Sequence, residues 1–312
     1  MKCTAAVRQL AYGNTPDAFD EYLQMSKHTA RDCLFHINKC IISLYMAEYL
    51  REPTLKDVKK IYNKHVTRHG FPGMLESFDY MHWEWKNCSV SWQGQYGKGD
   101  KKYPTIMLEA VASHDLWIWH AFFGVAGANN DINVLDNSSL FDDLLDDKAH
   151  VAPYVVNGVG FEKGYYLADG IYPQWATFVK SFTVANDAKH AYFKKRQESA
   201  RKDVERAFGV LQRRWGIIQQ PARQYHVNNI RRIMYSCIIM HNMILEDQKM
   251  AVFDWNDVYA NPSRNMQRTW VESGGGAVEW WWWSSRAVWW SSRAVMVLPK
   301  YGNKDGEECE EW

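Results

Sequence analysis

The sequence lacks several features that mark specialised classes of protein. Its six cysteines lie far apart and form no CxxC pair, which favours reduced thiols over a disulfide framework. It has no uncharged apolar run long enough to span a membrane, since the most apolar stretch, 106–127, contains Glu109 and Asp115. The start of the chain lacks the apolar segment of a signal peptide because Arg8 interrupts it. We therefore expect an intracellular protein without a membrane segment.

The chain also lacks a net charge that would indicate a partner. Its 37 Lys and Arg balance 36 Asp and Glu, giving a formal charge of +1. The distribution is uneven, because the segment 187–232 has twelve basic and four acidic residues, a net charge of +8. Such a segment suits contacts with phosphate groups, although a solvated helix face has a similar composition. The basic candidates for DNA binding here are Lys194, Lys195, Arg196, Arg201, Lys202 and Arg206.

The first seventy residues have a helical pattern. Thr15 followed by Pro16 is a typical helix start, and Ser26 is placed to cap the next helix. Two short helices joined by a turn predict a helix-turn-helix, with Lys27 and Arg31 exposed for DNA contact. The alternative is a plain helical hairpin packed on the main domain.

The middle of the chain mixes strand and helix patterns. Apolar runs predict strands at 74–82, 103–111, 116–125 and 164–168, the second and third forming a hairpin. Helical periodicity predicts helices at 131–147, 188–215 and 229–246. This order predicts an α/β domain with a mixed sheet. The segment 273–312 contains the heptad WWSSRAV twice in succession, at 282–288 and 289–295, and we expect a low-complexity appendage there.

Three acidic residues are candidate metal ligands: Asp79 in a strand, Asp169 at the end of another, and Glu205 on a helix. Converging carboxylates repel each other unless cations neutralise them, and oxygen ligands favour Mg²⁺ or Mn²⁺. Two such ions about 3.5–4 Å apart suit in-line phosphoryl displacement. Each residue also has a structural interpretation: Asp79 ends a strand, Asp169 begins an Asp-Gly turn, and Glu205 pairs with Arg201. Asp203 flanks the opposite edge of the same apolar stripe, so periodicity leaves the choice between it and Glu205 open.

Several segments then match a known family in order. They are 79–88 (DYMHWEWKNC), 92–96 (WQGQY), 108–113 (LEAVAS), 129–135 (NNDINVL), 164–173 (GYYLADGIYP), 201–211 (RKDVERAFGVL) and 241–244 (HNMI). Together they resemble the plant branch of Harbinger-type transposases. Two positions depart from that family's pattern, Tyr80 in place of Cys and Ser89 in place of Pro, and neither is a metal ligand.

The resemblance implies an RNase H-like fold, in which a mixed sheet is flanked by helices, with a DDE metal triad. Asp79 matches the first Asp, Asp169 the second, and Glu205, rather than Asp203, the third member. Members of the family cut DNA at transposon ends and join it to a target, using two divalent cations. They depend on a separate Myb-like protein for DNA binding and nuclear entry.

We accordingly expect three regions: a truncated helix-turn-helix-like region at 1–70, an RNase H-like nuclease domain at 71–250, and a linker with a Trp-rich tail at 251–312. The predicted protein is a metal-dependent DNA endonuclease or transposase that acts in the nucleus with a Myb-like partner. His82 and Arg206 are weaker candidates for contacts around the metals or phosphates. Two alternatives stay open: a non-catalytic factor that binds DNA or protein and retains the fold, and an RNase H-like enzyme acting on RNA.

Overall fold

The computed structural model describes residues 1–129, 138, 140, 151–168, 177–182, 184–185 and 187–248. The chain divides into two compact units, one made of Met1–Cys40 and Lys249–Trp312 and the other of Ile41–Gln248. Three expectations concern residues outside the described ranges: the helix at 131–147, the Trp-rich tail, and the position of Asp169. The domain boundaries predicted at residues 70 and 250 stay predictions.

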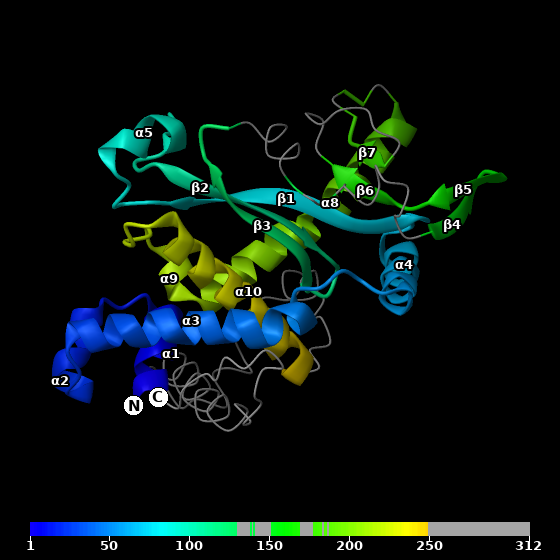
Figure 1. Cartoon of the computed structure of the whole chain (residues 1–312). Coiled ribbons are helices and arrows are strands. Elements are labelled where there is room, and N and C mark those ends of the chain that lie inside the picture. Colours follow the sequence, from blue (N-terminus) through cyan, green and yellow to red (C-terminus); the bar gives the residue numbers. More distant parts are fainter. Residues whose placement is uncertain are drawn as a thin grey trace, which may run out of the picture. The chain divides into compact units, whose positions relative to one another are not determined.

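The described residues of the first unit, 1–40, are helical, as their sequence predicts. Its described elements are α1 (Lys2–Tyr12), η1 (Pro16–Ala18), α2 (Phe19–Leu23) and the first part of α3 (Lys27–Tyr49), which continues into the second unit (Figure 1). Pro16 begins η1 directly after Thr15, and the Ser26 hydroxyl accepts a hydrogen bond from the Thr29 N–H at 3.3 Å. Both predicted helix starts are therefore confirmed. The Gln9 amide donates to the carbonyl of Ala30 at 2.8 Å, which ties α1 to α3.

The prediction of two short helices is wrong for the second one. Helix α3 has 23 residues, because no glycine or proline interrupts the chain between Lys27 and Tyr49. Lys27 and Arg31 are exposed near its start, as expected.

The second unit is built on a five-stranded mixed sheet with the order β3-β2-β1-β6-β7 (Figure 1). Antiparallel pairing joins β1, β2 and β3, whereas β1, β6 and β7 pair in parallel. The strands are β1 (Met74–Glu84), β2 (Thr105–Ala112), β3 (Ile118–Ala126), β6 (Tyr165–Ala168) and β7 (Phe178–Lys180). The four predicted strands are confirmed. Together with its flanking helices, the sheet confirms the predicted RNase H-like arrangement.

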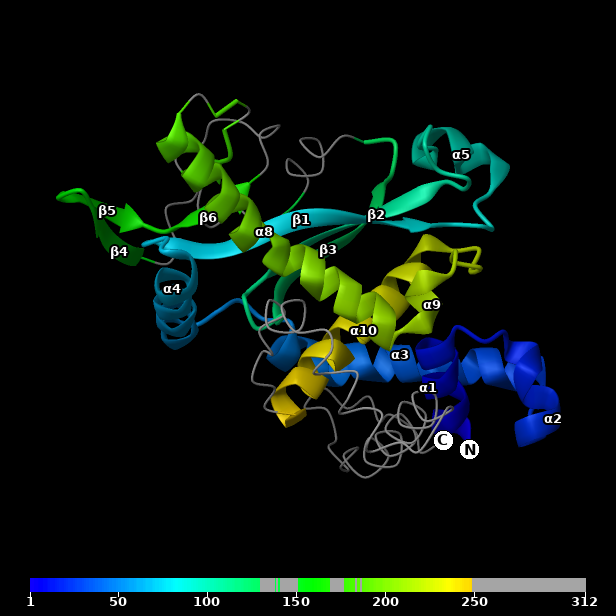
Figure 2. The same cartoon turned by 180° about the vertical axis from the view of Figure 1, so that it is seen from behind.

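Helices α8 (Ala188–Arg214), α9 (Gly216–Gln219) and α10 (Val227–Gln248) lie against one face of this sheet (Figure 2). The Ser77 hydroxyl of β1 donates to the carbonyl of Ala200 in α8 at 3.1 Å. The Trp83 indole donates to the carbonyl of Gln220, just after α9, at 2.8 Å. The apolar stripe of α8 faces the sheet and includes Ala200, Val204, Ala207, Phe208 and Leu211, all buried.

Helices α4 (Leu55–His69) and α5 (Val90–Tyr96) also belong to this unit. Helix α4 packs against β1 and α8, and it begins with a capping box between Thr54 and Asp57. It ends at Gly70, whose φ of 73° is in the left-handed region. Helix α5 lies in the connection from β1 to β2. No helix among the described residues is long and apolar enough to cross a membrane.

A two-stranded hairpin of β4 (Val151–Val156) and β5 (Val159–Lys163) precedes β6 and was not predicted. Its turn is Asn157-Gly158, with φ of 52° and 79°, which is the strongest short-range hairpin signal in a sequence. Gly73, with φ of 81°, precedes β1 and lies against the ring of Tyr154, where any Cβ atom would collide. The hairpin is thus packed against the start of the central strand.

Candidate active site

Asp79 lies in the middle of β1, the central strand of the sheet. Its Cα pairs with Ala110 of β2, and two residues earlier Ser77 pairs with Leu167 of β6. Because β1 and β6 are parallel, the residues that follow Ser77 and Leu167 run in the same direction. Asp169 comes two residues after Leu167 in the sequence and directly after Ala168, the last described residue of β6.

The side chain of Asp79 belongs to the face of the sheet that α8 covers. Ser77 donates to the carbonyl of Ala200, and the Met81 sulfur accepts from the Gln212 amide at 3.3 Å. Both Ala200 and Gln212 are on α8, and alternate residues of a strand point to the same face. Asp79, half-buried between Ser77 and Met81, therefore shares that face. One of its carboxylate oxygens accepts the backbone N–H of Tyr80 at 2.8 Å.

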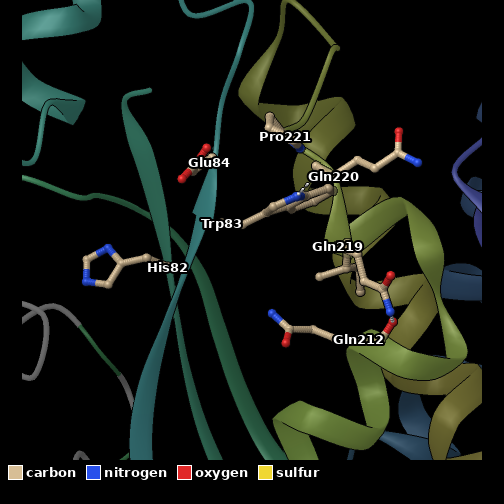
Figure 3. Close-up of a pocket in the computed structure, with 8 residues that line it drawn as sticks. His82, Trp83, Glu84, Gln212, Gln219, Gln220 and Pro221 are labelled. Carbon is tan, nitrogen blue, oxygen red and sulfur yellow. Dashed lines mark hydrogen bonds between the residues drawn. The ribbon is translucent and has the colours of Figure 1, made fainter. Parts of the chain in front are cut away.

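His82 is on the other side of the strand. Figure 3 shows it projecting away from Trp83, and it contacts Thr105 at 3.0 Å and accepts a hydrogen bond from Lys98 at 2.8 Å. Burial, followed by the charges of Lys98 and Lys101, lowers the pKa of His82 to about 4. The structure therefore does not bring His82 together with Asp79.

Glu205 lies on a ridge of α8 formed by residues four apart: Gln197, Arg201 and Glu205. The Gln197 amide donates to the carbonyls of Ala168 and Val179, at 3.1 and 3.3 Å, so the ridge begins at the ends of β6 and β7. Arg201 Nη2 is 3.9 Å from Glu205 Oε1, which confirms the predicted ion pair. The Glu205 side chain is 48% exposed and is therefore accessible to a cation or a solvated phosphate.

Asp203, the alternative to Glu205, is fully buried on the other edge of the α8 stripe. One of its oxygens is 3.5 Å from the His69 ring on α4, and the other pairs with Arg206. Residues two positions apart in a helix, such as Asp203 and Glu205, are separated by roughly 200° around the helix axis. Asp203 and Glu205 consequently face different surroundings: Asp203 is buried toward α4, whereas Glu205 is exposed.

Asp79 and Glu205 share one property that bears on the predicted cations. Asp79 and Glu205 both offer carboxylate oxygens, which Mg²⁺ and Mn²⁺ prefer. They come from the sheet and from the helix packed on it, on the side where α8 contacts the end of β6. Asp169 follows that end in the chain.

A comparison with family models identifies the chain. The model for the plant transposon protein family matches residues 47–252, well over half of the 312 residues. The chain belongs to this family. No curated protein and no solved structure matches it.

The family match covers β1, β6 and α8, and so contains all three candidate carboxylates. It also contains the basic candidates on α8. Of these, Lys195 and Lys202 are exposed, and Lys194, Arg196, Arg201 and Arg206 are partly buried. Arg206 pairs with the buried Asp203, whereas Arg201 lies beside Glu205. Lys27 and Arg31 precede the matched region and belong to the first unit.

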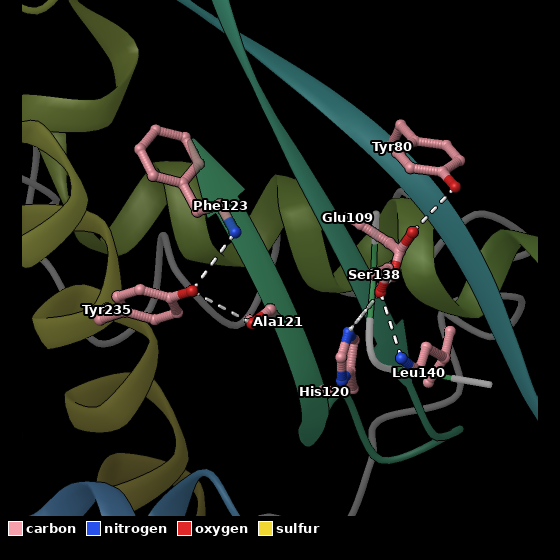
Figure 4. Close-up of polar contacts among 8 residues, drawn as sticks. All are labelled: Tyr80, Glu109, His120, Ala121, Phe123, Ser138, Leu140 and Tyr235. Carbon is pink, nitrogen blue, oxygen red and sulfur yellow. Dashed lines mark hydrogen bonds and ion pairs between the residues drawn. The ribbon is translucent and has the colours of Figure 1, made fainter. Parts of the chain in front are cut away.

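A second acidic centre, Glu109 of β2, was not predicted as a functional residue. It is fully buried and accepts hydrogen bonds from Tyr80 at 2.8 Å and from Ser138, with the His120 ring 3.2 Å away (Figure 4). Glu109 pairs in register with Tyr80 and so lies on the face opposite Asp79. The sequence signal that could have identified Glu109 is its position as the one charged residue in the apolar segment TIMLEAVA, which forms a wholly buried strand. With its partners supplied by the chain, Glu109 is a structural polar centre.

One small pocket lies near the end of β1, lined by residues of β1, α8 and α9 (Figure 3). The indole of Trp83 crosses it to reach the Gln220 carbonyl. Its lining residues are His82, Trp83, Glu84, Gln212, Ile218, Gln219, Gln220 and Pro221. Glu84 is the sole carboxylate among them, so this pocket does not provide the cluster that a pair of cations requires.

Proposed function

We propose that this plant transposon protein is a metal-dependent DNA endonuclease of the Harbinger transposase type, with Asp79, Asp169 and Glu205 as its metal ligands. The observation that supports the proposal is that α8, which carries Glu205, packs on β1, which carries Asp79. Asp79 is on the sheet face that α8 covers, and Glu205 is on the ridge of α8 that begins at the end of β6. Asp169 is the next residue of the chain after β6.

Two Mg²⁺ or Mn²⁺ ions bound by these carboxylates would lower the pKa of the attacking water or 3′ hydroxyl and stabilise the departing oxygen. The chain's own groups have separate tasks. Asp79 is held by the backbone N–H of Tyr80, which orients its carboxylate. Arg201 lies beside Glu205 and is the proposed contact to a phosphate of the bound strand.

The basic side of α8 is the proposed contact for the DNA backbone. Lys195 and Lys202 are exposed, and Lys and Arg that neutralise phosphates make binding strongly dependent on salt. We propose Lys27 and Arg31 on α3 as additional contacts to DNA. A Myb-like partner that supplies sequence recognition and nuclear entry is part of the same proposal.

The decisive experiment measures nicking of terminal-repeat DNA by the purified chain with Mn²⁺. We expect Asp79→Asn, Asp169→Asn and Glu205→Gln each to lower the nicking rate by at least about 100-fold. The reason is that a divalent ion contributes several kcal/mol of transition-state stabilisation, and about 1.4 kcal/mol corresponds to tenfold in rate. Glu198→Gln, an exposed position on the same helix, is the matched control and should nick normally.

Other outcomes would assign the protein differently. Salt-sensitive DNA binding without nicking, equal in the wild type and in Asp169→Asn, would identify a non-catalytic factor that retains the fold. Faster cleavage of an RNA–DNA hybrid than of DNA would identify an RNase H-like enzyme acting on RNA.

A further inference from the structure

Helix α4 presents two histidines, His65 and His69, on one face, since residues four apart in a helix are neighbours. Both are buried, and α8 places the fully buried carboxylate of Asp203 against them. One possible ligand atom from each of these three residues lies within 4.8 Å of the others. This His-His-Asp cluster is formed by two helices and is separate from Glu205, which lies on the other edge of α8.

The polar atoms of the cluster lack the hydrogen bonds that buried groups normally make. Neither ring nitrogen of His65 has a hydrogen-bond partner among the described residues, and the same holds for Nε2 of His69. Buried polar groups without partners are rare in native proteins, and an ion bound between them is one of the recognised explanations. Burial lowers the pKa of His65 to about 3, so its ring is neutral and has a lone pair to offer.

The two carboxylate oxygens of Asp203 contact different residues. Oδ1 pairs with Arg206, whose side chain extends toward the surface, and Oδ2 is directed to His69. The distance of 3.5 Å between Oδ2 and His69 Nε2 is close to the ~3.3 Å that separates two ligands of a tetrahedral ion with bonds of about 2.0–2.1 Å. One carboxylate oxygen therefore stays available to an ion while the arginine holds the other.

A third histidine is adjacent. His114, in the turn between β2 and β3, contacts His65 edge-on with ring centroids 5.7 Å apart. Its Nδ1 is also buried and has no hydrogen-bond partner within the described part of the chain. His114 is thus the side chain that could complete a four-coordinate site.

We propose that His65, His69 and Asp203 form a structural site for one Zn²⁺ ion, with His114 as the candidate fourth ligand. A set dominated by imidazole favours zinc, whereas the carboxylates of the proposed active site favour Mg²⁺ or Mn²⁺. The ion joins α4 to α8 at a position two residues from Glu205. It therefore fixes the orientation of the helix that carries the third candidate carboxylate.

The test uses the full-length protein, purified without a histidine tag and without added metal. We expect about one zinc per chain by elemental analysis, as in structural zinc sites. After removal of zinc, added Co²⁺ should produce the visible absorption of a tetrahedral site. His65→Gln and Asp203→Asn should each weaken Co²⁺ binding by at least about 100-fold, the upper range seen when even groups outside the ligand set are removed. His28→Gln, at an exposed position on α3, should leave it unchanged.

A measurement on the wild type alone covers the case in which a variant fails to fold. A zinc chelator should lower the melting temperature, and Zn²⁺, but not Mg²⁺, should restore it. Absence of stoichiometric zinc together with no tetrahedral Co²⁺ spectrum would overturn the proposal, as would a spectrum unaffected in a folded His65→Gln protein. Asp169→Asn should abolish nicking but retain the Co²⁺ spectrum, so the zinc site and the nuclease function can fail independently.

Discussion

Glu76 and Glu109 are both buried in the sheet, yet their surroundings differ. Glu109 is satisfied by Tyr80 and Ser138, with His120 beside it. One carboxyl oxygen of Glu76 has no hydrogen-bond partner among the described residues. Burial, and then the nearby charge of Asp115, raises the pKa of Glu76 well above its usual value. Glu76 is therefore protonated in the folded state at a pH where it ionises in the unfolded chain.

This difference predicts that Glu76→Gln stabilises the protein at pH 8. A raised pKa means that the folded state binds more protons, so the stability due to this group falls as the pH rises above the unfolded value of about 4.3. The expected gain in the free energy of unfolding is roughly 1.4 kcal/mol for each unit by which folding raises the pKa of Glu76. Chemical denaturation at pH 5 and pH 8 measures it, with the exposed Glu162→Gln as the control. A gain that is no larger at pH 8 than at pH 5 would contradict the prediction.

At the scale of elements, α8 connects the parts of the candidate active site. Asp187 caps its N-terminus by accepting the His190 N–H at 2.7 Å, and the helix runs 27 residues to Arg214. Along this length it contacts the ends of β6 and β7 through Gln197 and the central strand through Ala200. The position of Glu205 relative to Asp79 depends on these contacts.

We predict that Gln197→Ala lowers both stability and nicking. The substitution removes the donor to the carbonyls of Ala168 and Val179, and an unsatisfied buried group costs about 1–3 kcal/mol. The free energy of unfolding and the nicking rate are the two measurements, and the neighbouring exposed Glu198→Ala is the control. Unchanged stability would show that the Gln197 contacts do not hold the helix on the strand ends.

At the scale of the second unit, His241 links three elements. It lies on α10, donates from Nε2 to the carbonyl of Leu116 before β3 at 2.8 Å, and receives a hydrogen bond at Nδ1 from Arg214 of α8 at 3.2 Å. Burial, followed by the charge of Arg214, lowers the pKa of His241 to about 3. The ring is therefore neutral, as both contacts require.

His241 should make the protein sensitive to acid. Between the folded pKa of about 3 and the unfolded value of about 6.5, the unfolded chain binds more protons, so stability rises with pH and is lost as pH falls. In that window, His241 contributes up to about 1.4 kcal/mol per pH unit to the slope of the unfolding free energy against pH. His241→Asn should reduce the slope of unfolding free energy against pH by that amount, and His28→Asn should not. An identical slope in His241→Asn and wild type would refute this assignment.

Periodicity and local signals alone determined most of the elements: the strands around Asp79 and before Asp169, the long helix carrying Glu205, and the helical N-terminal region. The hairpin at 151–163 was also within reach, because Asn157-Gly158 is a strong turn signal. The cluster of His65, His69 and Asp203 was not, since His65 and Asp203 are more than 130 residues apart in the chain.

The different surroundings of Asp203 and Glu205 show what only the tertiary structure decides. Helical periodicity places both residues at the edges of one apolar stripe, and the family resemblance favours Glu205 without a physical reason. The fold covers the Asp203 edge with α4 and leaves Glu205 accessible. A sequence sets the angle of each side chain around its own helix, but the packing of distant segments determines which side chains meet water, a cation or another helix.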